Sequence, residues 1–303
     1  MTTLELVSPP DLKKAMAKTA EEIEEIIGEL IPPSTLTEAV IFDSMRYGSL
    51  GGGKRLRPFL VITSSDLFGV NHECALRVAA AIELVHCYSL IHDDLPAMDN
   101  ADLRRGRLTV HKKYDDAVAV LAGDGLLTYA FEILADPATH EDPHVRCKLV
   151  TALAKGAGAH GMVGGQMLDL IAEHQPFDIG AITRLQRLKT GELIAFSCEA
   201  GAILGRASPQ QHHALHAYAH DLGLAFQIVD DLLDHEGSEA QTGKSVGRDA
   251  AAGKATFVSI LGAERARAQA ALLVEQAARH LDIFEDRAEL LKAVARFVLE
   301  RRT

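Results

Sequence analysis

The sequence predicts an all-α protein. Of its 303 residues, 48% are hydrophobic, which is enough to bury a large core. Aromatic residues make up only 5% and Trp is absent, whereas Ala, Leu, Glu and Arg recur at helical spacings of three and four residues. No Pro/Ser-rich linker divides the chain, so we expect residues 1–303 to form a single domain, a large bundle of about ten or more helices.

Caps and helix breakers place the helices in order along the chain. The first is expected to begin after Asp11, its N-cap, and to end before Pro32. The second runs from about Leu36 to Tyr47 and leads into three glycines at 51–53, which can adopt positive φ and approach a ligand closely. Further helices are expected at about 55–69, 73–94, 115–135, 143–163, 179–205, 208–236, 255–280 and 285–302.

Charge and cysteine usage bound the class of protein. A formal net charge of -11 argues against a nucleic-acid binder, which needs a basic face to displace counterions from phosphates. The N-terminus lacks a signal-peptide pattern, and no run approaches the roughly 20 apolar residues that span a bilayer. We therefore expect a cytoplasmic protein. Four cysteines without a CxxC pair are expected to be buried, reduced thiols: Cys74, Cys87, Cys147 and Cys198.

An apolar helix that ends in two aspartates occurs twice, as YSLIHDDLPAMDN and as FQIVDDLLD. In the second segment, Asp230 and Asp234 are spaced by one helical turn and share a face, with Asp231 in the same cluster. Gln227 precedes Asp230 by three residues and extends this polar stripe. Because like charges so placed repel, the stripe requires a cation.

In the first segment, Pro96 is expected to end the helix and to let the loop fold Asp99 back toward Asp93 and Asp94. Hard carboxylate oxygens without Cys or paired His ligands suit Mg²⁺, which prefers to bridge one or two carboxylates to substrate phosphates. The candidate metal ligands are Asp93, Asp94, Asp99, Asp230, Asp231 and Asp234. A diphosphate between the two clusters would complete the site.

Basic residues that suit a diphosphate accompany these aspartates. Three cations stand beside the glycines at a helix start, where free N–H groups favour an anion: Lys54, Arg55 and Arg57. A second group, whose guanidinium forks can grip phosphate oxygens, follows the first aspartates: Arg104, Arg105 and Arg107. His86 lies two turns before Asp93 on the same face, about 10 Å away, and can donate to a second diphosphate.

Together these segments resemble the trans-prenyl diphosphate synthases, most closely the bacterial farnesyl diphosphate synthases. The resemblance covers about residues 36–262 and rests on five segments in order: GGGKRLRP, IELVHCYSLIHDDLPAMDNADLRRG, GGQMLDL, KTGELIAFSCEAGAILG and GLAFQIVDDLLD. It implies a bundle of the isoprenoid synthase type around a central apolar cavity. It also implies a homodimeric prenyltransferase that condenses isopentenyl diphosphate with dimethylallyl or geranyl diphosphate to farnesyl diphosphate.

The resemblance also implies roles for individual residues. Isopentenyl diphosphate would be held by Lys54, Arg57, His86 and Arg105, beside Gly53. The allylic diphosphate would be held by Arg104, Lys189, Lys244 and Lys254. About three Mg²⁺ ions per site, replaceable by Mn²⁺, would be bound through Asp93, Asp99 and Asp230, while Thr190 and Gln227 point oxygens at the reacting carbons. Loop 235–254 is expected to act as a lid. Relatives often carry an acidic residue where this chain has Ala101.

Product length depends on residues one turn before the first aspartates. Ser89 lies nearly under Asp93, whereas Tyr88 is about 140° away at roughly 100° per residue, so helical geometry alone does not identify the blocking residue. In the resembled family an aromatic residue at the position of Tyr88 limits elongation. This favours the fifteen-carbon product over a geranylgeranyl diphosphate synthase activity.

Three other interpretations remain. The pair His92-Asp93 is compatible with a metal-dependent phosphohydrolase, but further His ligands at suitable spacing are lacking. A cyclising terpene synthase would share the metal chemistry but has no use for a second diphosphate site. A catalytically silent partner subunit of a prenyl synthase would be expected to lose one acidic cluster, and both are intact here.

Overall fold

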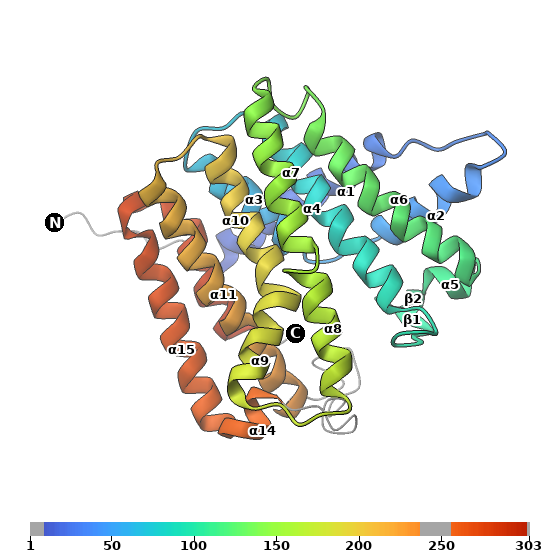
Figure 1. Cartoon of the computed structure of the whole chain (residues 1–303). Helices are drawn as coiled ribbons and strands as arrows, with labels where there is room; N and C mark the ends of the chain where they lie inside the picture. The colour runs from blue at the N-terminus through green and yellow to red at the C-terminus, as the bar shows by residue number, and fades with distance from the viewer. Residues whose placement is uncertain (1–8, 237–255, 302–303) are drawn as a thin grey trace. The chain divides into compact units, whose positions relative to one another are not determined.

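The computed structural model describes residues 9–236 and 256–301. The chain divides into two compact units: Lys13–Val150, and the residues from Thr151 onward together with the described residues up to Leu12. The predicted all-α class is confirmed, because the described ranges contain helices and a single two-stranded hairpin (Figure 1). We describe each unit by itself, and a single domain remains a prediction.

The elements follow one another with short connections. Those before the middle of the chain are α1 (Pro9–Leu30), α2 (Ala39–Ser49), α3 (Leu56–Asp66), α4 (His72–Asp93), β1 (Leu103–Arg104), β2 (Arg107–Leu108), α5 (Val110–Lys113), α6 (Asp116–Ala135) and α7 (Pro143–Ala157). The later ones are α8 (Met162–Ala172), α9 (Ile179–Gln186), the π-helical turn η1 (Arg187–Gly191), α10 (Glu192–Leu204), α11 (Pro209–Glu236), α14 (Phe257–Leu261), α15 (Ala263–His280), the 3₁₀ segment η2 (Leu281–Ala288) and α16 (Glu289–Glu300).

Helix α4 forms the core of the unit Lys13–Val150. Its N-terminus is capped by Asn71, whose side chain accepts hydrogen bonds from two backbone amides of the first turn. The residues from Ala79 to Val85 are all buried, as expected of a helix covered on every side. Helices α3 and α6 pack against it, and α6 runs beside it in Figure 1. The first aspartate motif therefore starts from the most rigid element of this unit.

Helix α11 has the same role in the other unit, where α10 and α15 pack against it (Figure 1). Tyr218 on α11 is fully buried, and its hydroxyl donates a 2.7 Å hydrogen bond to the carbonyl oxygen of Leu291. At Gly223, α11 comes so close to η1 that an added Cβ would lie 3.2 Å from the Cα of Gly191. The second aspartate motif ends this helix.

Two predicted helices are each divided by a glycine. The expected helix at 143–163 ends at Ala157, and α8 begins after Gly161, whose added Cβ would overlap the carbonyl of Gly156. The expected helix at 255–280 is interrupted at Gly262, which has a φ of 81°. The hairpin β1–β2 and helix α8 were not predicted. A periodic pattern does not show where one helix ends and another begins in line with it.

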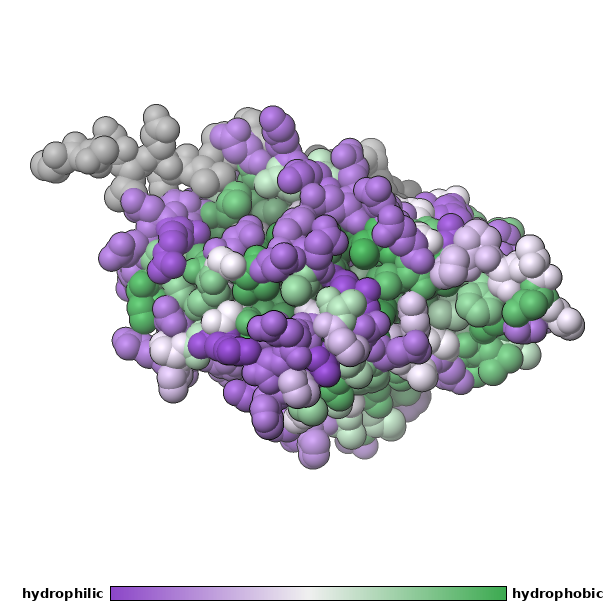
Figure 2. Space-filling view, turned by 90° about the horizontal axis from the view of Figure 1, so that it is seen from above, coloured by the Kyte–Doolittle hydropathy of each residue, from purple (hydrophilic) through white to green (hydrophobic). Residues whose placement is uncertain are grey.

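Two statements about exposure need correction. Cys147 is exposed and Cys74 half-buried, so only Cys87 and Cys198 are the expected buried thiols. Two helices, α4 and α6, are long and apolar enough to cross a membrane by length and composition alone. Within the structure 72% of the apolar window of α4 is buried, as in the core helix of a globular protein, against 39% in α6. Figure 2 shows apolar side chains scattered among hydrophilic ones on one face of the molecule.

Candidate active site

The loop after α4 folds back on the end of the helix, as the sequence predicts. The backbone N–H of Asp99 donates a 2.9 Å hydrogen bond to the carbonyl oxygen of Asp93, and that of Ala101 donates to Asp94 at 3.1 Å. Asn100 allows the reversal by adopting a φ of 47°. The side chains of Asp93, half-buried, and Asp99, exposed, thus belong to one short turn.

The second aspartate of this motif has a different environment. Asp94 is only 3% exposed, and both of its carboxylate oxygens accept hydrogen bonds from Arg104, at 2.8 Å and 3.0 Å from Nε and 2.7 Å from Nη2. This bidentate pair fixes the direction of the Arg104 guanidinium. Asp94 was predicted as a metal ligand, and the structure places its oxygens against Arg104 instead of solvent.

Arg104 and its neighbours belong to the hairpin β1–β2. The turn residues Arg105 and Gly106 have φ values of 52° and 74°, the combination that a tight two-residue hairpin requires. The Arg105 guanidinium donates to the carbonyl oxygen of Gly52, and that of Arg107 donates to Leu50 at 3.0 Å. The hairpin thereby fastens the basic cluster to the glycine loop.

Glycine is needed in this loop because arginine side chains lie against its backbone. Gly51 and Gly53 have φ values of 115° and 124°. A Cβ added at Gly53 would lie 2.7 Å from the guanidinium of Arg105, and one at Gly51 would overlap that of Arg107. The predicted role of Gly53 at a phosphate site is thus joined to a visible one, which is to let Arg105 approach.

His86 lies among these cations. Burial lowers the pKa of the His86 imidazole well below its ordinary value, so the ring is neutral at physiological pH. The positive charges that lower it further belong to Arg57, Arg105, Arg104 and Arg55. One neutral donor surrounded by guanidinium groups suits an anion such as diphosphate.

Arg55 differs from the other cations of this group. Its side chain is fully buried and forms ion pairs with Glu24 and, at 2.6 Å, with Glu83; it also donates to the carbonyl oxygen of Ser49 at 2.7 Å. Burial alone would raise the pKa of Glu24, but the hydrogen bond and charge of Arg55 bring it below its ordinary value. Arg55 is therefore not available to a phosphate, whereas Lys54 is exposed.

The aspartates of α11 are also unequal. Asp231 is 7% exposed and accepts a 2.8 Å hydrogen bond from the backbone N–H of Phe257, the first residue of α14. Asp230 is exposed and pairs at 2.5 Å with Arg301, which also donates to the carbonyl oxygen of Phe226. Asp234 lies one turn beyond Asp230, half-buried, as the spacing predicts.

Lys189 and Thr190 occupy the π-helical turn η1, a distortion often found at functional sites. The ammonium group of Lys189 pairs at 2.8 Å with Asp169 of α8. A Cβ at Gly165 would overlap the backbone of Lys189, so this glycine lets α8 approach η1 closely. Gln227 is half-buried on α11, one turn before Asp230. The structure thus keeps these polar side chains on helices that are packed together.

Two predicted features lie outside the described residues. Lys244, Lys254 and most of the predicted lid 235–254 belong to residues 237–255. Within the described ranges, no group of three or more His, Cys, Asp or Glu side chains is arranged to hold a metal ion by itself. This fits Mg²⁺ bound through one or two carboxylates and completed by phosphate oxygens and water.

Of the two candidate length-determining residues, Tyr88 is the one near the first aspartate. Its side chain is 7% exposed, and burial together with the charge of Asp93 raises its pKa to about 12. Ser89 donates its hydroxyl to the carbonyl oxygen of His86 at 2.8 Å, within its own helix. The structure therefore favours Tyr88 as the bulky group beneath Asp93.

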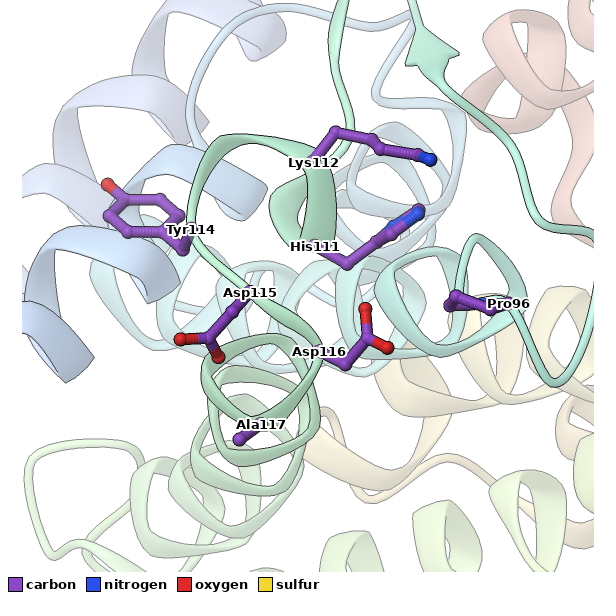
Figure 3. A pocket seen from close by; sticks show the side chains of 7 residues that line it. All are labelled: Pro96, His111, Lys112, Tyr114, Asp115, Asp116 and Ala117. Carbon is purple, nitrogen blue, oxygen red and sulfur yellow. The ribbon is translucent and has the colours of Figure 1, made fainter.

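A pocket of about 640 Å³ lies beside the first aspartate loop (Figure 3). It is lined by Pro96, His111, Lys112, Tyr114, Asp115, Asp116 and Ala117. The Nδ1 atom of His111 lies 3.0 Å from the hydroxyl oxygen of Thr109, which donates to the carbonyl oxygen of Ala101. None of the predicted substrate residues lines this pocket, so we do not assign the substrate to it.

Comparison with known proteins decides the family. The polyprenyl synthetase family model matches residues 38–296. The chain belongs to the polyprenyl synthetase family. It is 43% identical over 270 residues to the farnesyl diphosphate synthase of Geobacillus stearothermophilus, covering 89% of each protein. It is 40% identical to the geranylgeranyl diphosphate synthase of Cyanophora paradoxa, covering 93% of each. The apo crystal structure of an FPP/GFPP synthase from Zymomonas mobilis superimposes with a TM-score of 0.88 at 51% identity, covering 96% of this chain and 99% of that one.

Family membership confirms the resemblance seen in the sequence and the predicted bundle of the isoprenoid synthase type. Sequence reasoning missed several residues that shape the polyprenyl synthetase site. These residues are Glu24, Glu83, Asp169 and Arg301. Only Asp169 had a local signal, since it lies in the segment GGQMLDL that carries the resemblance.

Proposed function

We propose that the protein is a short-chain prenyltransferase that condenses isopentenyl diphosphate with dimethylallyl or geranyl diphosphate to give farnesyl diphosphate. The observation that carries the proposal is the bidentate pair between Asp94 and Arg104, because it joins the carboxylate-bearing loop to the arginine hairpin. Carboxylates for a divalent cation and guanidinium groups for a diphosphate thus occur at one place in the unit Lys13–Val150. The names of the similar proteins support the same activity.

The donor set fits magnesium. Asp93, Asp99 and Asp230 present exposed or half-exposed carboxylates and would hold Mg²⁺ ions, with Asp234 beside Asp230. When bound, the ions would neutralise charge that develops on the leaving diphosphate. Asp94 and Asp231 would act indirectly, by orienting Arg104 and the start of α14.

The reaction needs no nucleophilic side chain. The allylic C–O bond breaks, the diphosphate leaves with the electron pair, and the double bond of isopentenyl diphosphate attacks the resulting cation. The new cation then loses a proton, which the released diphosphate accepts. Arg104 and Lys189, with Lys244 and Lys254, would stabilise the departing anion. The oxygens of Thr190 and Gln227 would stabilise the positive charge on carbon. Lys54, Arg57, His86 and Arg105 would hold isopentenyl diphosphate.

A single assay tests the function. The purified chain is incubated with Mg²⁺, isopentenyl diphosphate and geranyl diphosphate, and the dephosphorylated products are separated by chain length. We expect a fifteen-carbon product that disappears with EDTA and returns with Mg²⁺ or Mn²⁺, since the carboxylates alone cannot neutralise the diphosphate. Absence of product from the folded chain would support a silent partner subunit, and release of phosphate without condensation would support a phosphohydrolase.

A homodimer is the proposed assembly, and α6 offers the surface for it. Val120 and Leu121 are 41% and 58% exposed, and Leu127 and Phe131 continue the same apolar face half-buried. A second copy of the chain would cover this face. We expect light scattering to give about twice the chain mass of 32.7 kDa, and Leu121→Asp to shift the mass toward the monomer. A monomeric wild-type protein would contradict the assembly but not the activity.

A further inference from the structure

Two rings stack one turn before the first aspartates. Tyr88 and His92 lie four residues apart on α4 in an edge-to-face arrangement, with ring centroids 5.7 Å apart and planes at 82°. Tyr88 is buried, so its ring has few alternative positions while the imidazole stays in place.

The imidazole is itself held by α6. Nε2 of His92 lies 3.1 Å from the carbonyl oxygen of Val120, and because a carbonyl only accepts, Nε2 carries the proton. The ring lies directly against the α6 backbone at Gly123, where an added Cβ would overlap it. A continuous contact therefore runs from the α6 backbone through His92 to Tyr88.

We propose that product length is set by this ring brace, defined as Tyr88, His92 and Gly123, and not by Tyr88 alone. The inference rests on the proposed function and adds two specificity-determining residues to it. His92 acts as a positioning residue, because it holds the Tyr88 ring across the path of the growing hydrocarbon. Gly123 acts through His92, because its lack of a side chain gives the imidazole its place.

Removal of the brace opens the floor without removing the blocking ring. In His92→Ala, the space left by the imidazole lets the Tyr88 ring rotate aside. In Gly123→Ala, the added methyl group displaces the imidazole from its hydrogen bond with Val120 and frees the ring in the same way. Both changes therefore favour a longer product.

The test measures the ratio of twenty-carbon to fifteen-carbon product from geranyl diphosphate and excess isopentenyl diphosphate, with a thermal melt of each variant. We expect His92→Ala and Gly123→Ala to raise this ratio about 3- to 10-fold, the size of one aromatic pair interaction. Tyr88→Ala should raise it further. The double variant Tyr88→Ala/His92→Ala should match Tyr88→Ala, because the imidazole acts only through the ring.

Gly125→Ala is the matched control. It adds the same methyl group to the same helix, but the new Cβ would lie 2.9 Å from Sδ of Met45 and away from His92. Its product ratio should equal that of the wild type. The brace is overturned if His92→Ala folds and keeps the wild-type ratio, or if Gly125→Ala lengthens the product as much as Gly123→Ala. A wild-type protein that yields no prenyl product in either length class overturns the proposed function as well.

Discussion

Replacement of Asp93 by Asn is expected to slow turnover about 10²- to 10³-fold, the usual effect of losing one electrostatic group at a reacting centre. Asp93 is half-buried at the last position of α4, and its backbone carbonyl, not its side chain, holds the loop through Asp99. The amide therefore leaves the fold intact while it weakens the binding of Mg²⁺. The measurement is kcat at saturating substrates across a Mg²⁺ titration, beside a thermal melting curve.

Asp94→Asn is the matched control, since it makes the same change one residue later. Asp94 is buried and accepts all its recorded side-chain hydrogen bonds from Arg104, so the variant should lose about 1.5–3 kcal/mol of stability as well as activity. Its Mg²⁺ dependence should stay close to that of the wild type. If Asp94→Asn changed the Mg²⁺ requirement and Asp93→Asn lowered the melting temperature, the two assignments would have to be exchanged.

The features that sequence predicts well are local. Pro96 and the glycines act on the residues next to them, so the end of α4 and the return of Asp99 toward Asp93 follow from the order of residues. Asp230 and Asp234 share a face for the same reason, because a helix fixes the direction of residues one turn apart. The positions of the two motifs were therefore predicted correctly at the level of the helix.

Sequence could not show which member of each aspartate pair is buried. That distinction depends on partners far along the chain: Asp231 binds the N–H of Phe257, and Asp230 pairs with Arg301, 71 residues away. Such pairings leave no periodic pattern. The hairpin escaped for another reason, because strands of two residues are too short for an alternating pattern of apolar side chains.

The same non-local pairing makes Glu83 a strong test of the glycine loop. Glu83→Gln is expected to lower the free energy of unfolding by about 3 kcal/mol, because it removes the charge of one partner from a buried ion pair. The Glu83 side chain is 3% exposed and accepts a 2.6 Å hydrogen bond from Arg55, whose side chain is fully buried. The loss is measured by urea unfolding followed by circular dichroism.

Glu24→Gln removes the other partner of Arg55 and separates stability from loop position. Glu24 is 32% exposed, so its ion pair contributes only about 0.5–1 kcal/mol, but its two oxygens accept the N–H groups of Gly51 and Gly52 at 3.1 Å. We expect this variant to remain nearly as stable as the wild type while its KM for isopentenyl diphosphate rises several-fold with kcat unchanged, because the loop that presents Lys54 is less well held. Equal losses of stability in both variants would show that Arg55 does not discriminate between its buried and its half-exposed partner. An unchanged KM in Glu24→Gln would show that the glycine loop keeps its position without Glu24.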